Sequence, residues 1–418
     1  MIKTPAMITN RQSVVQIVRA ASSDIISALS GDIFSFSLSL MLLHATQSAV
    51  SFGLGQVIYP VIGLLLVVPI SNYIDTHAHK PLILISKLVA LVSLIGYSLV
   101  IFQTSHKLLA SVVIITIFGI CDKFSQTGYT ASVHELVNPE HIKPLTAIEQ
   151  AATSGVQLFS PLIATLLYTL IGFGGVLKIE IVAETLVLVI TLSMHFHPQP
   201  RTLVEAVGGG QLVRFKRGLT YILQHNVLRF VVQMAIWLNL LFAALTIGLP
   251  YVMIQQLHLG NTKLGWVMST LSAGILLGNL VLTKLPEFKN LIKSMLRLVF
   301  IFGSAFIGVG LLFLGRPGDQ IIVVSLMIGA VLLGVMLALI NTPISVYMQT
   351  TVPTEMLGRI GGTVNTLTMM ASPLGILAYS WLFQRVPAWG IFLGTGALVF
   401  VLIAVFWHLG NRPVEPTV

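Results

Sequence analysis

The chain has 418 residues, of which 9% are charged and 55% are hydrophobic, and its formal net charge at pH 7 is +9. Its mean hydropathy is +0.92, and an average soluble domain carries about 25% charged residues. This composition excludes an ordinary soluble enzyme, a disordered chain and a secreted disulfide scaffold, and it predicts an integral membrane protein. The single cysteine, Cys121, excludes an internal disulfide and a cysteine metal cluster.

Twelve apolar stretches are each long enough for a membrane-spanning helix, which needs about 20 mostly apolar residues. The first stretch lacks a nearby small-residue cleavage site, so we interpret it as an uncleaved first span. The predicted fold is therefore all-α, with spans at 22–44, 50–72, 81–103, 108–133, 145–171, 175–196, 226–251, 262–284, 293–315, 319–348, 359–383 and 388–409.

The longest connection lies between the sixth and seventh spans. Two prolines and three consecutive glycines mark residues 198–210 as a linker. Residues 212–223 then place apolar side chains on one helical face and basic ones elsewhere, which predicts an amphipathic helix on the cytoplasmic leaflet. The expected domains are an N-terminal six-helix bundle (1–197), a cytoplasmic linker (198–225) and a C-terminal six-helix bundle (226–418).

The basic residues predict the orientation. With a cytoplasmic N-terminus and alternating sides, 17 basic residues fall inside and 5 outside, while Lys123 lies within a span. The 17 include Lys87, which we assign to the cytoplasmic side. Because positive charge accumulates on cytoplasmic loops, we expect a plasma-membrane protein with both termini in the cytoplasm. The positive net charge then reflects orientation and contact with anionic lipids, and no nucleic-acid partner is expected.

Two short matches suggest that the halves are related. Residues 137–140 (Val-Asn-Pro-Glu) match 352–355 (Val-Pro-Thr-Glu) at an offset of 215, and 160–162 (Ser-Pro-Leu) match 372–374 at an offset of 212. Both pairs occupy the same relative place in the two halves. Paired six-helix halves with a binding site at the membrane midplane are a recurring transporter plan.

Residues 349–359 read Gln-Thr-Thr-Val-Pro-Thr-Glu-Met-Leu-Gly-Arg, and residues 29–36 read Leu-Ser-Gly-Asp-Ile-Phe-Ser-Phe. Both segments resemble motifs of the major facilitator superfamily, in a bacterial branch that includes macrolide efflux proteins and siderophore exporters. The resemblance covers essentially the whole chain. It implies two pseudo-symmetric six-helix bundles, transport of a small molecule by alternating access, and function as a monomer.

The resemblance also implies a cytoplasmic gate. The loop between spans two and three (71–80) retains Asp75 and Lys80 of the superfamily pattern but lacks its glycines and arginines. Asp75 is expected to meet the start of span eleven, where a helix N-terminus and the Arg359 guanidinium favour a carboxylate. The antiporter signature of span five is present only in part, as Ser-Pro-Leu-Ile-Ala at 160–164.

Ionisable groups within spans are costly and are therefore candidates for function. Asp32 has fully apolar flanks and is the first candidate for proton coupling, the alternative being a structural hydrogen bond to another helix. Asp122 adjoins Lys123, and because the two lie about 100° apart on the helix their side chains cannot point the same way. One of them could pair with Asp32 or Glu184, the alternative to a functional role being a buried structural ion pair. Glu180 and Glu184 share a helix face and could line an outer vestibule or be simply solvated.

The expected substrate cavity combines Asp32 and Lys123 with the aromatic residues Phe36, Trp237 and Tyr347, although packing and lipid contact are the usual roles of such aromatics. The dipeptide Gly-Lys never occurs, so the chain has no nucleotide-binding phosphate loop. We expect no cofactor, no metal site and no enzymatic activity. The leading hypothesis is a proton-coupled exporter of amphipathic molecules. The alternatives are a facilitator or symporter that imports a polar metabolite, and a membrane enzyme or sensor.

Overall fold

All regular elements in the described residues are helices. The computed structural model describes residues 10–197, 211–284, 290–352 and 354–410. The helices are α1 (Asn10–Thr46), α2 (Ala49–Thr76), α3 (His79–Val100), α4 (Lys107–Leu136), α5 (Pro139–Ser193), α6 (Gln211–Gln224), α7 (Asn226–Tyr251) with the π-helical turn η1 (Val252–Gln256), α8 (Gly260–Leu282), α9 (Leu291–Gly315), α10 (Asp319–Thr351), α11 (Thr354–Arg385) and α12 (Ala388–Gly410).

Twelve helices account for the predicted spans. Ten described helices are long and apolar enough to cross a membrane. The other two are the parts of α5, which Gly172 divides because its left-handed φ of 67° interrupts the helix. Glycine adopts this conformation without a Cβ clash. The predicted twelve-helix fold is confirmed, and Gly172 falls in the break predicted between spans five and six.

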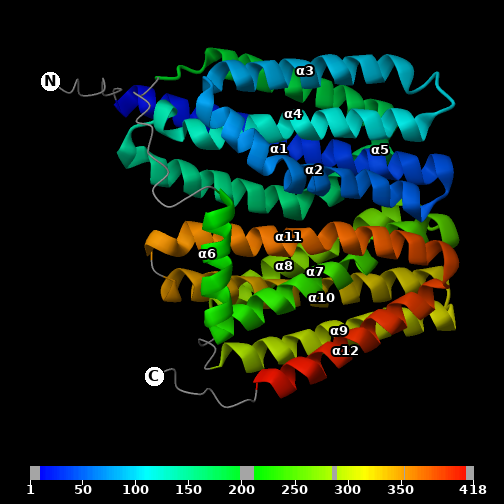
Figure 1. Cartoon of the computed structure of the whole chain (residues 1–418). Helices are drawn as coiled ribbons and strands as arrows, with labels where there is room; N and C mark the ends of the chain where they lie inside the picture. The colour runs from blue at the N-terminus through cyan, green and yellow to red at the C-terminus, as the bar shows by residue number, and fades with distance from the viewer. Residues whose placement is uncertain (1–9, 198–210, 285–289, 353, 411–418) are drawn as a thin grey trace, which may run out of the picture. The chain divides into compact units, whose positions relative to one another are not determined.

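The contacts divide the chain into two units (Figure 1). The first, here called the N-terminal unit, comprises Met1–Gln47 and Leu54–Val207; the second, the C-terminal unit, comprises Ser48–Gly53 and Gly208–Val418. The first residues of α2 belong to the C-terminal unit, where Gln384 Nε2 donates a hydrogen bond to Ser48 Oγ. The predicted domain boundaries stay a proposal, because residues 198–210 lie outside the described part.

In the N-terminal unit, α1 packs along α5 and α3 packs against α4. Their shared core is aromatic and aliphatic, with Phe34, Leu38, Leu94 and Leu177 almost completely buried. In the C-terminal unit, α7 pairs with α11, α8 with α10 and α9 with α12. Within each unit, the helices therefore bury apolar faces against their neighbours in the same unit. They leave other apolar side chains exposed on the outside.

Two helices differ from the expectation. Helix α1 begins at Asn10, twelve residues before the predicted span, because Gln16 and Arg19 bond to the end of α5. Helix α6 runs across the direction of its neighbours (Figure 1) and packs on α7 and α11. Its Ile222 is buried beside Leu228, whereas Leu223, predicted for the same apolar face, is exposed.

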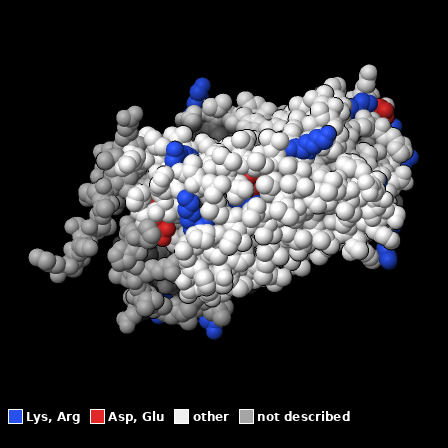
Figure 2. Space-filling view, turned by 90° about the horizontal axis from the view of Figure 1, so that it is seen from above, with Lys and Arg blue, Asp and Glu red and all other residues white. Residues whose placement is uncertain are grey.

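Charged side chains are sparse on the outside of the molecule. The face shown in Figure 2 is almost entirely free of them, apart from isolated lysine, arginine and acidic residues. Large aliphatic side chains are instead exposed on the helices, for example Leu88, Val92 and Leu99 of α3. An apolar exterior on helices of this length suits a hydrocarbon solvent.

Candidate functional site

The N-terminal unit contains a lysine that is almost completely buried. Lys87 of α3 is 1% exposed. Its Nζ donates hydrogen bonds to Ser27 Oγ of α1 at 2.6 Å and to Glu184 Oε1 of α5 at 3.0 Å. Asp122 Oδ1 of α4 lies 3.9 Å from the same nitrogen. One ammonium group therefore connects four helices of this unit.

The carboxyl groups around Lys87 differ in how they are satisfied. Tyr59 of α2 donates a hydrogen bond from its hydroxyl to Asp122 Oδ2. Glu184 is 0% exposed and uses one oxygen for Lys87, while its second oxygen has no hydrogen-bond partner in the described residues. Glu180 is 1% exposed, and neither of its carboxyl oxygens has such a partner there. Ser30 Oγ lies near Glu180 but donates to the Ser27 carbonyl oxygen at 3.5 Å.

Two further acids of α1 lie within electrostatic range of this group. Asp32, the first sequence candidate, is half-buried and close enough to Asp122 for their charges to interact, as is Asp24. The structure thus brings together all four acids predicted for proton coupling: Asp32, Asp122, Glu180 and Glu184. We call these four acids and Lys87 the acid cluster.

The sequence analysis missed Lys87. It assigned this residue to the cytoplasmic side, whereas the structure places it inside α3 among buried side chains. The signal was present, because Lys87 stands within the predicted span 81–103, as Asp32 does within its own span. The solvated outer vestibule considered for Glu180 and Glu184 also differs from the structure, in which both are buried.

Lys123 points elsewhere. Its Nζ donates to Gln126 Oε1 of the same helix at 3.0 Å, and a Cβ at Gly63 of α2 would lie 3.8 Å from it. Within the described residues no ion pair joins Lys123 to the adjacent Asp122. Lys87 is the nearer cation to Asp122, at 3.9 Å, and Lys123 acts on Asp122 from a greater distance.

The predicted gate is described only in part. Lys80 Nζ donates to the carbonyl oxygens of Leu192 and Met194 at 3.0 and 2.6 Å. Arg19 donates to the Ser193 carbonyl oxygen at 2.6 Å. These cations satisfy the carbonyl groups at the end of α5 and complement its dipole. Asp75 lies in α2 and Arg359 in α11, but both side chains fall outside the described residues.

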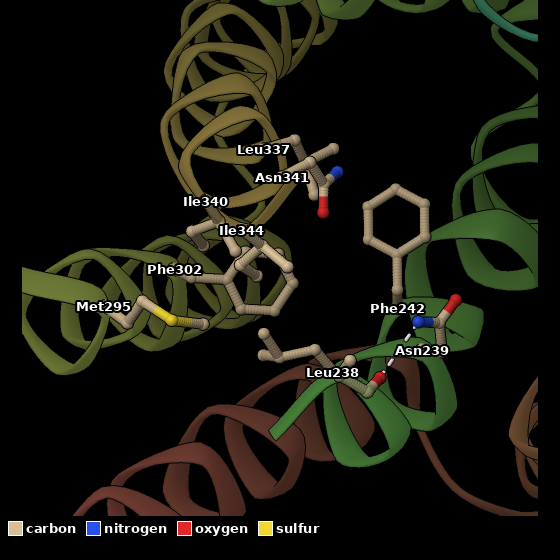
Figure 3. A pocket seen from close by; sticks show the side chains of 10 residues that line it. Leu238, Asn239, Phe242, Met295, Phe302, Leu337, Ile340, Asn341 and Ile344 are labelled. Atoms are coloured by element: carbon tan, nitrogen blue, oxygen red, sulfur yellow. Dashed lines mark hydrogen bonds between the residues drawn. The ribbon is translucent and has the colours of Figure 1, made fainter. Parts of the chain in front are cut away.

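The C-terminal unit holds a pocket of about 250 Å³ between α7, α9 and α10. Its lining is mostly aliphatic and aromatic, with Phe242 and Phe302 facing each other at 6.3 Å between ring centroids. Two side-chain amides, Asn239 and Asn341, are the polar members of this lining. Figure 3 shows the Asn341 amide beside the Phe242 ring, whereas Asn239 Nδ2 bonds at 2.9 Å to the Ala235 carbonyl oxygen of its own helix.

The predicted cavity aromatics do not line this pocket. Phe36 is 8% exposed in the N-terminal unit, and Trp237 is 44% exposed on α7. Tyr347 packs against the cluster around Ile222 and Leu228. Their place in a substrate cavity stays a prediction. Among the described residues, no group of three histidine, cysteine or acidic side chains could hold a metal ion.

Twelve helices in two compact units, ten of them long and apolar enough to cross a membrane among the described residues, with ionisable groups inside them, are the architecture of a secondary transporter. A sequence model of the Major Facilitator Superfamily matches residues 21–376, and the chain belongs to this superfamily. The family predicted from the motifs is confirmed. The protein is thus a multi-pass membrane transporter of small molecules.

Curated relatives are similar at low identity. Macrolide efflux protein A of Streptococcus pyogenes is 21% identical over 341 residues, which cover 79% of this chain and 80% of that protein. The multidrug efflux pump Tap of Mycolicibacterium fortuitum is 31% identical over 148 residues, 35% of this chain and 34% of that protein.

Solved structures share the fold. A bacterial homologue of the iron transporter ferroportin, in an inward-facing state, superposes with a TM-score of 0.67 at 13% identity, over 96% of this chain and 99% of that one. The nucleoside transporter NupG gives a TM-score of 0.65 at 12% identity, over 95% and 100%. At these identities the likeness shows the fold alone.

Proposed function

We propose that this protein is a proton-coupled exporter of amphipathic small molecules of the drug or macrolide type, working by alternating access. The observation that carries the proposal is the acid cluster. Four acids and one lysine lie within electrostatic range of one another inside membrane-length helices, where ionisable groups are expensive and are candidates for function. The efflux proteins named among the relatives support the direction of transport.

The pocket of the C-terminal unit supports an amphipathic substrate. It offers aromatic and aliphatic walls together with two uncharged amides, a lining typical of small-molecule sites. A charged metabolite would find no fixed counter-charge in this lining. The alternative is a facilitator or symporter that imports a polar metabolite, which the two amides would favour and the apolar walls oppose.

Protons can supply enough energy for export. Moving one charge through 100 mV is worth about 2.3 kcal/mol, and a tenfold concentration gradient of substrate costs about 1.4 kcal/mol. One proton per molecule is therefore sufficient for export against more than a tenfold gradient. Asp32 is the proposed group at which protons and substrate compete, because it is the half-buried member of the cluster on α1.

The proposed location is the plasma membrane, with both termini in the cytoplasm and lipids around a monomer. Removing Lys87 from the cytoplasmic count leaves 16 basic residues inside against 5 outside, which still favours this orientation. A latch between Asp75 and Arg359 is the proposed cytoplasmic gate. Lys80 contributes to it by holding the end of α5 in place.

Transport by everted membrane vesicles tests the proposal. Vesicles with the wild-type protein are energised with a proton gradient and offered ethidium, erythromycin and polar metabolites, and proton movement is followed by fluorescence quenching. We expect uptake of ethidium or erythromycin, and loss of that uptake in Asp32→Asn. Asp319→Asn is the matched control, because Asp319 is an exposed acid at the start of α10. Uptake of a polar metabolite alone, or full activity of Asp32→Asn, would contradict the assignment.

A further inference from the structure

Three carboxyl groups of the acid cluster share one ammonium group. Lys87 Nζ is 3.0 Å from Glu184 Oε1 and 3.9 Å from Asp122 Oδ1. Glu180 lies one turn before Glu184 on α5, within electrostatic range of both Glu184 and Asp122. A single positive charge can balance only one of the three carboxylates.

The geometry determines which carboxyl group Lys87 balances. Lys87 is held by the short bond to Ser27 Oγ and by the bond to Glu184 Oε1, which is the nearer of its two acids. Glu184 is fully buried, and an ion pair with this contact is the arrangement in which a buried carboxylate remains ionised. We therefore assign the resident charge to Glu184.

Glu180 forms no ion pair among the described residues, and Lys87 acts on it from farther away than on Glu184 and Asp122. Both of its oxygens are buried and lack a hydrogen-bond partner in the described residues. Lys178, the other cation nearby in sequence, is exposed. A carboxylate in this position would be buried without compensation, which is far more costly than a neutral carboxyl group. This burial favours the neutral, protonated form of Glu180 over the carboxylate.

We propose that Glu180 is a second proton-carrying group of the transport cycle, beyond Asp32, and that Lys87 is the positioning residue that keeps Glu184 ionised beside it. This inference rests on the proposed proton coupling. In the transfer, the O–H bond of the protonated Glu180 breaks as an O–H bond forms at the Asp122 carboxylate, so the negative charge moves from Asp122 to Glu180, and the reverse transfer returns the proton to Glu180. Asp122 is suited to exchange this proton with water because its side chain is 18% exposed.

Separating coupling from substrate movement tests the role of Glu180. The purified protein is reconstituted in liposomes with radiolabelled erythromycin, and two modes are compared: accumulation driven by a pH gradient, and exchange of labelled for unlabelled erythromycin without a gradient. We expect Glu180→Gln to lose gradient-driven accumulation to the level of protein-free liposomes and to retain exchange. Glu180 is buried and does not touch substrate in this proposal. Gradient-driven accumulation at the wild-type rate in Glu180→Gln would overturn it.

The role of Lys87 is tested by removing both members of its ion pair. The double variant Lys87→Met/Glu184→Gln keeps Glu180 and removes one charge of each sign, so we expect it to be more stable to thermal unfolding than the single variant Lys87→Met. The single variant Lys87→Met leaves the Glu184 carboxylate unpaired, and we expect it to lose accumulation. A double variant that is no more stable than Lys87→Met would overturn the pairing of Lys87 with Glu184.

A spectroscopic measurement covers the case in which Glu180→Gln fails to fold. The infrared spectrum of the wild-type protein is expected to contain the C=O stretch of a protonated carboxyl group at neutral pH. This band should shift in Glu180→Asp and stay unchanged in Glu184→Asp; the reverse pattern would overturn the inference. Failure of the wild-type protein to couple erythromycin to protons would instead contradict the proposed function, whatever the infrared result.

Discussion

The second and fourth helices of each half are held together in opposite ways. In the C-terminal unit, α8 and α10 meet backbone to backbone: a Cβ at Gly274 would lie 2.3 Å from the Val331 carbonyl oxygen. In the N-terminal unit, α2 and α4 are instead connected by side chains, with the Tyr59 hydroxyl bonded to Asp122 and Gly63 facing the end of Lys123. One repeated plan therefore contains a close contact of glycines in one half and a polar bridge in the other.

The different contacts of these two helix pairs indicate where this fold has room for ionisable groups. Backbones in contact, as at Gly274, Gly278 and Gly334, leave no space for a polar side chain between helices, and such small-residue contacts stabilise helix pairs in membranes. Between α2 and α4 of the N-terminal unit, the side chains of Tyr59, Asp122 and Lys123 occupy the corresponding space. The ionisable groups proposed for proton coupling therefore lie in the unit whose second and fourth helices are bridged by side chains.

The largest expected effect comes from leaving a charge unpaired in the N-terminal unit. Lys87→Met removes the counter-charge of the fully buried Glu184 and should destabilise the protein by about 3–5 kcal/mol. Thermal unfolding of the purified protein in detergent measures this loss. Lys123→Met is the matched control, because Lys123 bonds only to Gln126 of its own helix among the described residues, and it should change stability by less than about 1 kcal/mol. Equal losses in both variants would remove the special status of Lys87.

The backbone contact of the C-terminal unit gives the next largest effect. A Cβ at Gly334 would lie 2.3 Å from the Leu271 carbonyl oxygen, so Gly334→Ala should force α8 and α10 apart and cost about 1–3 kcal/mol. Gly329 lies on the same helix with open space around its Cβ position, and Gly329→Ala should be neutral or gain up to about 1 kcal/mol. Thermal unfolding of the two variants compares them directly. A Gly334→Ala protein as stable as the wild type would show that this close backbone contact does not contribute to the stability of the C-terminal unit.

The sequence predicts the helices better than it predicts what they hold. Twelve spans follow from apolar stretches, because every spanning helix needs about the same length of them, and Gly172 falls in a predicted break. The prediction placed Lys87 on the cytoplasmic side because Lys87 lies near the end of a span. That position does not show which side chains the lysine contacts in the folded protein. The start of α1 was missed because Gln16 and Arg19 are polar, and only their bonds to α5 explain their place in a helix.

The pocket of the C-terminal unit could not be predicted for a related reason. Asn239 and Asn341 are uncharged and stand in apolar helices, so hydropathy and charge give no signal at either position. Phe242 is one of many aromatic residues within the spans, and the sequence analysis named Phe36, Trp237 and Tyr347 for the cavity instead. The four acids of the cluster could be singled out because a charge within a span is conspicuous. The structure places them within electrostatic range of one another, and their role in proton coupling stays a prediction.

A prediction at Asn341 tests whether the C-terminal unit binds the uncharged part of the substrate. Asn341→Leu keeps the size of the side chain but removes both hydrogen-bonding groups from the pocket, which we expect to cost about 1.4 kcal/mol, or roughly a tenfold rise in the half-saturating concentration of erythromycin. Initial rates in reconstituted liposomes measure it. Asn365→Leu is the matched control, because Asn365 lies on α11 outside the pocket lining. The same rise in both variants would argue against a site in the pocket.

The smallest expected effect concerns a hydrogen bond that both units have in common. Each contains a buried tyrosine bonded to a hydroxyl of the next helix: Tyr97 to Ser111 at 2.8 Å and Tyr379 to Thr395 at 2.9 Å. Interhelical hydrogen bonds of this kind contribute about 0.6 kcal/mol on average in membrane proteins, so Tyr97→Phe and Tyr379→Phe should each lower stability by about that amount. Thermal unfolding of both variants, alone and together, measures it. Because the two hydrogen bonds belong to separate units, the stability losses of the two variants should add. A combined loss well beyond their sum would mean that the two units unfold together and are not independent.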